Sequence, residues 1–497
     1  MNGPLFLLGF AIYLILMIGV SYLVSRRQRS SEDFLLAGRS VSGPLTLGTT
    51  VATMIGTGTS MGAVGYAYQH GWGGILYGVG GAVGILLTAW LFAPLRQLRF
   101  MTMSEELSYY AGANQWVKHC SAVLIFLASL GWLGAHIIGG ALYLSWATGI
   151  DLLYAKLLIA TAFTLYVMIG GYKAVVWTDS LMALVLFCGF ILMSAAALYA
   201  SGGIAALANQ VSHALQQGKM SSLALLPAIS LALVVAVGVM ATPSFRQRIY
   251  AARSVATVRR SFLLSGGLYL LFATLPAIIG ITAFSLQPAL ENHQFAFSTV
   301  AVMLLPAALA MLVLLAGLSA TLSSASSDAI AAVSVLICDL YQAVTGHMPP
   351  TDKAVYYARL AVLLVSGFAL LLALLSDDLI SYISNMIATL IAGMFVVVLL
   401  GRFWPRLNWQ GALAAMLTSL LVSLLVISQS AWLDVWGNPC IPAVVSAGLA
   451  AVITSLLTPA SVLNRDEALE HITAQREADY LPVQQHSVGS GALKQRY

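Results

Sequence analysis

"VATMIGTGTSMG", residues 51–62, interrupts an apolar segment with glycines, threonines and a serine. The surrounding segment, 44–66, is long enough to cross a membrane, since a helix needs roughly 20 apolar residues to span the bilayer core. Glycine is the weakest helix former after proline. The stretch therefore predicts a helix that unwinds at membrane depth, where nonhelical backbone survives only if it lines a cavity or is buried in protein.

The composition is that of a membrane protein. Of 497 residues, 60% are hydrophobic and only 8% are charged, whereas a soluble domain carries about 25% charged residues. The apolar segments predict an all-α, polytopic membrane protein with about thirteen transmembrane helices. We place these spans at 4–25, 44–66, 72–98, 117–147, 152–171, 174–201, 223–244, 260–286, 297–341, 353–376, 379–403, 409–430 and 438–458.

The loops between these spans predict the orientation. Lys and Arg gather in alternate loops and in the C-terminal tail, including the cluster of arginines at 246–260. Positive loops face the cytoplasm, so the N-terminus is expected outside and the C-terminus in the cytoplasm. The formal charge of +5 requires no nucleic-acid partner, and we expect a monomer in the lipid bilayer.

A second interrupted span accompanies the first. "VGVMATPSF", residues 237–245, places Pro243 inside an apolar segment, where proline removes a backbone donor and clashes with a carbonyl one turn back. Two broken helices at corresponding positions indicate a secondary transporter built from inverted repeats. The alternative is a packing glycine in one helix and a simple proline kink in the other.

The stretch "LSATLSSASSDAIAAVSVL", 318–336, carries hydroxyls within an apolar segment. At 100° per residue, Ala320, Ser323, Ser324 and Ser327 share an arc of about 100°. Hydroxyl and carbonyl oxygens suit a hard cation such as Na⁺, although small residues also serve close helix packing.

Two carboxylates, Asp179 and Asp328, lie inside predicted spans. An isolated Asp at the bilayer centre costs roughly 2.5–3.5 kcal/mol, so such residues usually face a cavity, a partner or an ion. Asp179 has the alternative of pairing with Lys173 near the interface. Asp328 fits either an ion or coupling site or a structural pair.

Four segments carry a family resemblance. They are "EDFLLAGRSVSGPLTLGTTVAT" (32–53), "GGYKAVVWTDSLM" (170–182), "SATLSSASSDA" (319–329) and "CDLY" (338–341). In this order and spacing they make the chain resemble the sodium/solute symporters over roughly residues 5–460. Asp328 is not expected from that family.

The resemblance implies a bacterial inner-membrane protein with the leucine-transporter fold and a 5+5 inverted repeat. The chain then divides into a leading helix and cytoplasmic loop (1–43), a transport core (44–403), two trailing helices (404–460) and a cytoplasmic tail (461–497). Within the core, repeat one covers 44–201 and repeat two covers 223–403.

The resemblance also implies site residues. The main Na⁺ site corresponds to Ala52, Ile55, Ala320, Ser323 and Ser324, and the second Na⁺ ion of some members corresponds to Asp179, Ser323, Ser326 and Ser327. The solute is expected against the broken helices and two further spans. Its candidate contacts are Thr57, Gly58, Trp132, His136, Met240, Thr242 and Asn385.

We therefore expect no enzyme but a Na⁺-coupled symporter that moves a small organic solute into the cell by alternating access. The solute could be an amino acid, a sugar acid, another carboxylate or a vitamin. Two alternatives stay open. Asp328 and His136 would suit a proton-coupled symporter of the same fold, and a membrane sensor would need a separate kinase partner because the tail has no room for one.

Overall fold

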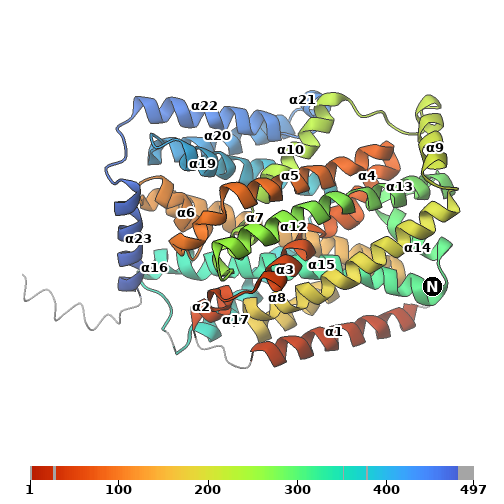
Figure 1. The fold of residues 1–497 in the computed structure, drawn as a ribbon, viewed down its shortest axis with the longest axis horizontal. Helices are drawn as coiled ribbons and strands as arrows, with labels where there is room; N and C mark the ends of the chain where they lie inside the picture. Colours follow the sequence, from red (N-terminus) through yellow and green to blue (C-terminus); the bar gives the residue numbers. More distant parts are fainter. Residues whose placement is uncertain (1–2, 26–29, 351, 376–378, 480–497) are drawn as a thin grey trace, which may run out of the picture.

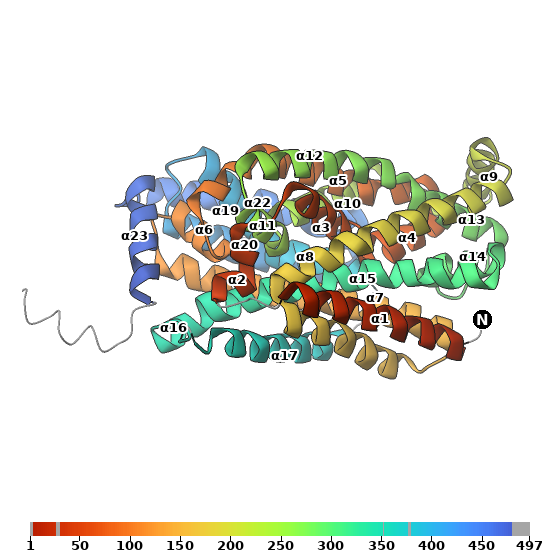
Figure 2. The ribbon, with the colours of Figure 1, turned by 60° about the horizontal axis from the view of Figure 1, so that its bottom comes forward.

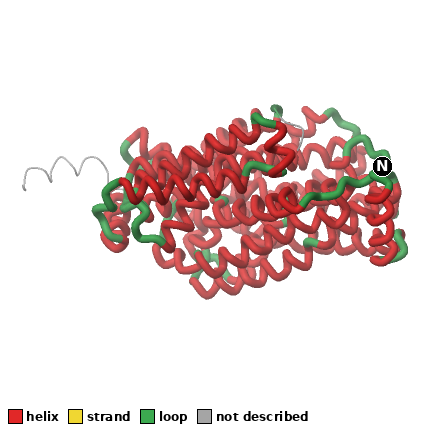
Figure 3. Tube along the Cα trace, turned by 90° about the horizontal axis from the view of Figure 1, so that it is seen from above, coloured by secondary structure: helices red, strands yellow, loops and turns green. Residues whose placement is uncertain are grey.

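The computed structural model describes residues 3–25, 30–350, 352–375 and 379–479. These residues are helical almost throughout (Figures 1 and 3), and within them the only strand-like pairing is an isolated bridge between Val41 and Ala252. The all-α expectation is confirmed for this part of the chain.

The helices follow one another with few long connections. The first part of the chain forms α1 (Gly3–Ser25), α2 (Ser31–Leu36), η1 (Ala37–Arg39), α3 (Gly43–Met54), η2 (Gly58–Gly62), α4 (Ala63–His70), η3 (Gly71–Gly74), α5 (Ile75–Leu91), η4 (Ala93–Leu98), α6 (Met103–Tyr110), α7 (Gln115–Thr148), α8 (Leu152–Ala200) and α9 (Ile204–Gln216). The middle forms α10 (Leu225–Ala241), α11 (Pro243–Ala251), α12 (Val255–Phe272), α13 (Thr274–Leu286), η5 (His293–Phe295), α14 (Ala296–Leu304), α15 (Ala307–Val335), η6 (Leu336–Tyr341) and α16 (Gln342–Thr345). The last part forms α17 (Ala354–Ala373), α18 (Leu379–Met386), η7 (Ile387–Ile391), α19 (Ala392–Phe403), α20 (Trp409–Ile427), α21 (Ser430–Trp436), α22 (Cys440–Leu457) and α23 (Arg465–Asp479).

The long helices run side by side along the longest axis of the molecule. Both ribbon views place the start of α1 and the short helix α9 at one end of this bundle (Figures 1 and 2). The same views place α23, the last described helix, across the opposite end. The two described ends of the chain therefore lie at opposite ends of the bundle, which is the arrangement that an odd number of crossings requires.

By length and composition, ten helices in the described residues can cross a membrane, or eleven if α10 and α11 count as one bent span. One of the ten, α8, has 49 residues and would be about 74 Å long at 1.5 Å per residue, more than twice the roughly 30 Å of a bilayer core. Gly171 interrupts it with φ 54° and ψ −160°. The predicted spans 152–171 and 174–201 thus appear as one element bent at Gly171.

Both predicted helix breaks are confirmed. Helix α3 ends at Met54, and the chain resumes as the π-helical turn η2 at Gly58. Helix α10 ends at Ala241, and α11 begins at Pro243 with a bend of 41°.

The predicted continuous span 297–341 is wrong in one respect. Leu305 and Pro306 separate α14 from α15, with Pro306 extended at φ −55° and ψ 147°. Proline cannot donate a backbone hydrogen bond inside a helix, so the chain starts a new helix directly after it.

Helix α15 forms the centre of the bundle. It packs against α7, α8 and α3, and every residue from Val313 to Val335 is buried. A helix that is buried all round has no lipid-facing side. The hydroxyls of α15 are therefore turned toward other helices and not toward lipid.

Two arginines depart from the loop assignment. Arg246 and Arg248, which the sequence predicts as positive loop residues, lie in α11 and are each 1% exposed. Arg253, Arg259 and Arg260 are exposed and still fit a positive loop.

Candidate ion and solute site

The broken segment after α3 meets the serines of α15. The Ser323 hydroxyl lies 3.2 Å from the Ala52 carbonyl and 3.2 Å from the Ala320 carbonyl of its own helix, and its single proton is shared between these two acceptors. The next hydroxyl, that of Ser324, donates to the Thr53 carbonyl at 3.3 Å. Residues 271 positions apart in the sequence are therefore in direct contact.

The break also releases the carbonyl of Ile55. Ile55 has nonhelical angles, φ −95° and ψ 56°, and the Thr59 and Ser60 amides both donate to the Gly56 carbonyl. The Ile55 carbonyl therefore has no acceptor role in the turn that follows, and a ligand can use it.

This donor set fits a sodium ion. Ala52, Ala320, Ser323 and Ser324 are at most 1% exposed, and they offer neutral carbonyl and hydroxyl oxygens. Two oxygens that each lie about 2.4 Å from a hard cation, at right angles, are about 3.4 Å apart. The 3.2 Å oxygen separations around Ser323 are close to that value, so small shifts would admit an ion.

The second predicted ion set has a charged neighbour that the sequence did not reveal. The Asp179 carboxylate accepts from the Thr49 hydroxyl at 2.6 Å and from the Ser327 hydroxyl at 3.1 Å. The Arg248 guanidinium lies 3.4 Å from the same carboxylate oxygen and donates to Ser327 Oγ at 2.7 Å. The positive charge next to Asp179 thus belongs to Arg248 and not to Lys173, the partner considered from the sequence.

The hydroxyls of the other two members, Ser323 and Ser326, donate to backbone carbonyls. The Ser323 hydroxyl is used at the first site, and the Ser326 hydroxyl donates to the Ser323 carbonyl at 2.8 Å. Arg248 also donates to the Thr49 hydroxyl at 2.9 Å and contacts the Thr53 hydroxyl. The guanidinium therefore occupies the space between α3, α8 and α15.

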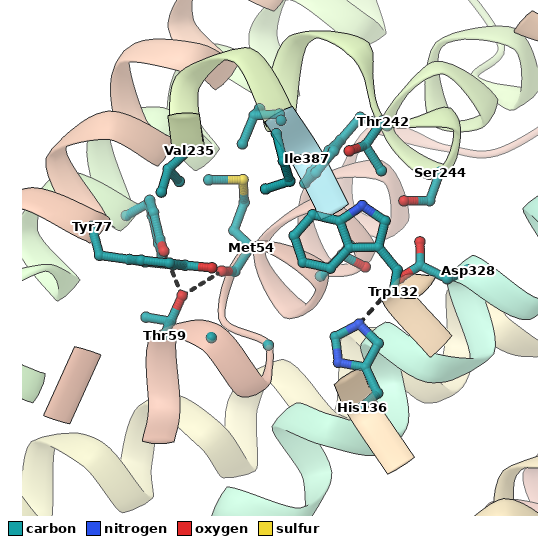
Figure 4. A pocket seen from close by; sticks show the side chains of 17 residues that line it. Met54, Thr59, Tyr77, Trp132, His136, Val235, Thr242, Ser244, Asp328 and Ile387 are labelled. Atoms are coloured by element: carbon teal, nitrogen blue, oxygen red, sulfur yellow. Dashed lines mark hydrogen bonds and ion pairs between the residues drawn. The ribbon is translucent and has the colours of Figure 1, made fainter. Parts of the chain in front are cut away.

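A cavity lies beside the two broken helices. Its volume of about 50 Å³ is several times the roughly 10–15 Å³ that one ordered water needs, which suits a small solute. It is lined by Thr53, Met54, Gly56, Gly58, Thr59, Tyr77, Trp132, His136, Val235, Gly238, Val239, Thr242, Ser244, Phe245, Tyr269, Asp328 and Ile387. Figure 4 shows Trp132, His136 and Asp328 close together, with Tyr77 and Thr59 on the other side of the cavity.

Four of the seven predicted solute contacts line this cavity, namely Gly58, Trp132, His136 and Thr242. Thr57, Met240 and Asn385 are not among its lining residues. Met240 follows Val239 by about 100° around the helix, which turns its side chain away from the face that Val235, Gly238 and Val239 present.

Thr57 has a supporting position behind the cavity. Its hydroxyl lies 2.9 Å from His136 Nδ1 and 3.2 Å from the Thr321 hydroxyl. It therefore links the break after α3 to both α7 and α15, and it orients the His136 ring.

Asp328 is paired within the cavity wall. Its Oδ2 lies 3.1 Å from His136 Nε2, and both residues are about 3% exposed. Trp132, one turn before His136 on α7, stacks near that ring with a centroid separation of 6.1 Å. Asp328 is thus part of the solute cavity and lies outside both predicted ion sets.

The aromatic wall was not predicted. Tyr77, Phe245 and Tyr269 line the cavity, and the Tyr269 hydroxyl lies 2.5 Å from that of Thr59. These side chains come from α5, α11 and α12, and in the sequence they resemble any other aromatic residue of a membrane span.

The geometry agrees with a family comparison. The model of the sodium:solute symporter family matches residues 34–419. The chain belongs to the sodium:solute symporter family. Both broken helices and all the serines of α15 lie within the matched region.

Individual relatives extend the match over most of the chain. It is 26% identical to a sodium/pantothenate symporter of Haemophilus influenzae over 434 residues, 83% of this chain and 88% of that protein. It is also 26% identical to a sodium/proline symporter of Salmonella typhimurium over 95% of this chain and 96% of that protein. A solved Na⁺-coupled sialic acid symporter, substrate-bound and outward-open, shares the fold with a TM-score of 0.78 at 22% identity, covering 93% of this chain and 98% of the other.

Family membership supports three expectations from the sequence. The chain is a multi-pass membrane transporter, its relatives are symporters and not enzymes, and sodium is the coupling ion. The likeness to the sialic acid symporter structure supports the fold alone.

Proposed function

We propose that this protein is a Na⁺-coupled symporter that carries a small organic solute into the cell by alternating access. The observation that carries the proposal is the contact between the Ser323 hydroxyl and the Ala52 carbonyl, which joins a broken helix to the central serine-rich helix. An ion bound there holds α3 and α15 together, while the adjoining cavity holds the solute.

We further propose thirteen spans and a 5+5 inverted repeat. Each broken helix is then the first helix of its repeat, in repeat one (44–201) and in repeat two (223–403). Outside the repeats lie the leading segment (1–43), the trailing helices (404–460) and the tail (461–497). The spans are α1, α3 with α4, α5, α7, the two halves of α8, α10 with α11, α12 with α13, α15, α17, α18 with α19, α20 and α22. Exposed arginines near the start of α12 favour an outside N-terminus and a cytoplasmic C-terminus.

The main ion site comprises Ala52, Ile55, Ala320, Ser323 and Ser324 in this proposal. The second set, Asp179 with Ser323, Ser326 and Ser327, has a resident positive charge in Arg248. We therefore propose that Arg248 takes the place of a second ion and that one Na⁺ enters per solute.

One ion is sufficient to drive accumulation. A charge moving inward across 100 mV releases roughly 2.3 kcal/mol, and a tenfold Na⁺ gradient adds about 1.4 kcal/mol. Together these support about 500-fold accumulation of a neutral solute.

Uptake by proteoliposomes tests the proposal. Candidate solutes are first found by thermal shift of the purified protein with and without Na⁺, and the radiolabelled hit is then offered to the vesicles. An inward Na⁺ gradient should drive uptake at equal internal and external pH. Uptake driven only by an inward H⁺ gradient would instead support the proton-coupled alternative.

A further inference from the structure

The solute cavity has an acidic side chain in its wall and, in the described part of the chain, no Lys or Arg side chain there to balance it. Its described lining residues include one carboxylate, Asp328, and one histidine, but neither Lys nor Arg. Arg248, which contacts the lining residue Thr53, is already paired with Asp179. Asp328 therefore has no fixed positive charge of its own among the described residues that line the cavity.

His136 forms a hydrogen bond with only one of the two oxygens of the Asp328 carboxylate. Its Nε2 contacts Asp328 Oδ2, while its Nδ1 faces the Thr57 hydroxyl. Thr57, in the break after α3, thus holds the His136 ring in place. The ring in turn holds the Asp328 carboxylate in the cavity wall. Within the described chain the second carboxylate oxygen makes no hydrogen bond, which leaves it open to a donor on the solute.

Three further polar groups in the same wall lack partners. Trp132 Nε1, Thr242 Oγ1 and Ser244 Oγ are buried without a hydrogen bond among the described residues, and Figure 4 shows these side chains on the same side of the cavity as Asp328. Buried polar groups are almost always hydrogen-bonded. A polar head group of a solute bound here would find hydrogen-bond partners in this cluster.

The rest of the wall suits the body of an organic cation. Trp132, Tyr77 and Phe245 line the cavity together with apolar side chains such as Val235 and Ile387. The face of an aromatic ring attracts a positively charged group within about 6 Å of its centroid. Carboxylate and aromatic surfaces together recognise ammonium groups.

Building on the proposed function, we propose that the solute carries a positively charged amine or quaternary ammonium nitrogen, which pairs with Asp328 beside Trp132. His136 and Thr57 are positioning residues for this carboxylate. Solutes with only a carboxylate are rejected, because they would meet a second negative charge without a compensating Lys or Arg.

Thermal shift with matched compounds tests this inference on the full-length protein in detergent and NaCl. The probes are ethanolamine, choline, glycine betaine and the common L-amino acids, set against acetate, propionate, gluconate and glycerol. At least one ammonium compound should stabilise the protein, and the carboxylates and glycerol should not. A panel in which no ammonium compound stabilises it, or in which the anions do, overturns the inference.

Two variants locate the effect. Asp328→Asn keeps the shape of the side chain and should weaken the binding of the stabilising ammonium compound at least 100-fold. Asp434→Asn, at an exposed position on α21, should leave it unchanged. Both variants should keep the stabilisation by Na⁺ that the solute-free protein shows relative to K⁺.

The pattern of failure separates the two levels of the proposal. Unchanged ammonium binding in Asp328→Asn overturns the assignment of the solute class. If the solute-free wild-type protein is equally stable in Na⁺ and in K⁺, the proposed function itself is contradicted.

Discussion

Arg248 Nη2 lies 3.4 Å from Asp179 Oδ2 in the interior of the bundle, and both side chains are fully buried. A buried charge costs several kcal/mol to desolvate, and the partner's charge and hydrogen bonds offset this cost. Thr49 and Ser327 supply additional hydrogen bonds to the carboxylate. The pair therefore acts as a fixed link between α8 and α11 behind the proposed ion site.

Removing one member of this pair should destabilise the protein strongly. Asp179→Ala leaves the Arg248 guanidinium buried without a counterion, so we expect a loss of about 3–5 kcal/mol. Thermal unfolding in detergent measures it. Asp151→Ala, at the cap of α8, is the control and should cost about 1 kcal/mol. An Asp179→Ala variant as stable as the control would contradict the structural role of the pair.

The position of Arg248 also predicts the ion stoichiometry. If the guanidinium takes the place of a second ion, Na⁺-dependent uptake should follow a Hill coefficient near one. The measurement is the initial rate of uptake as a function of external Na⁺ at saturating solute. A coefficient near two in the wild-type protein would support a second ion at Asp179 and Ser327.

Gly56 should tolerate no side chain. A Cβ at this position would lie 2.6 Å from Ser324 Oγ and 3.3 Å from His136 Cε1, so it would disturb the ion site and the solute cavity together. We expect Gly56→Ala to weaken both Na⁺ and solute binding at least tenfold. Gly19→Ala, where a Cβ meets nothing within 4 Å, is the matched control and should behave as wild type in both binding assays.

The bend of α8 depends on Gly171. Its φ of 54° and ψ of −160° are essentially restricted to glycine, and a Cβ would lie 2.7 Å from the Phe34 carbonyl. Gly171→Ala should cost about 1–3 kcal/mol of stability, measured by thermal unfolding. Gly267→Ala, in open space on α12, should be neutral or slightly stabilising, because glycine in a helix costs roughly 0.5–1 kcal/mol relative to alanine. Equal stability of the two variants would show that the bend tolerates a side chain.

The sequence predicted the parts of the site that depend on local chemistry. Glycine content and Pro243 indicated the two breaks, because both effects act on the residue's own helix. The 100° spacing of Ser323 and Ser324 indicated a shared polar face. The Ala52 carbonyl, which the Ser323 hydroxyl contacts in the structure, came from the family resemblance.

What the sequence did not reveal depends partly on contacts between distant segments and partly on the local path and rotation of a helix. Arg248 is separated from Asp179 by 69 positions, and in sequence it resembles any other positive loop residue. Because Pro306 lies in an otherwise apolar run, composition predicts one continuous span over 297–341, whereas α15 begins as a new helix after Pro306. Met240 was placed at the solute, whereas Val239, its neighbour, lines the cavity.

Equilibrium binding of Na⁺ to the solute-free protein tests the central claim most directly. The change in melting temperature is followed as NaCl replaces KCl at constant ionic strength, in wild type, Ser323→Ala and Ser319→Ala. Ser319→Ala is the control, because the Ser319 hydroxyl donates to the Leu315 carbonyl of its own helix. Saturable stabilisation by Na⁺ is expected in wild type and Ser319→Ala, with an at least tenfold weaker affinity in Ser323→Ala. Equal Na⁺ affinity in all three proteins would contradict an ion site between α3 and α15.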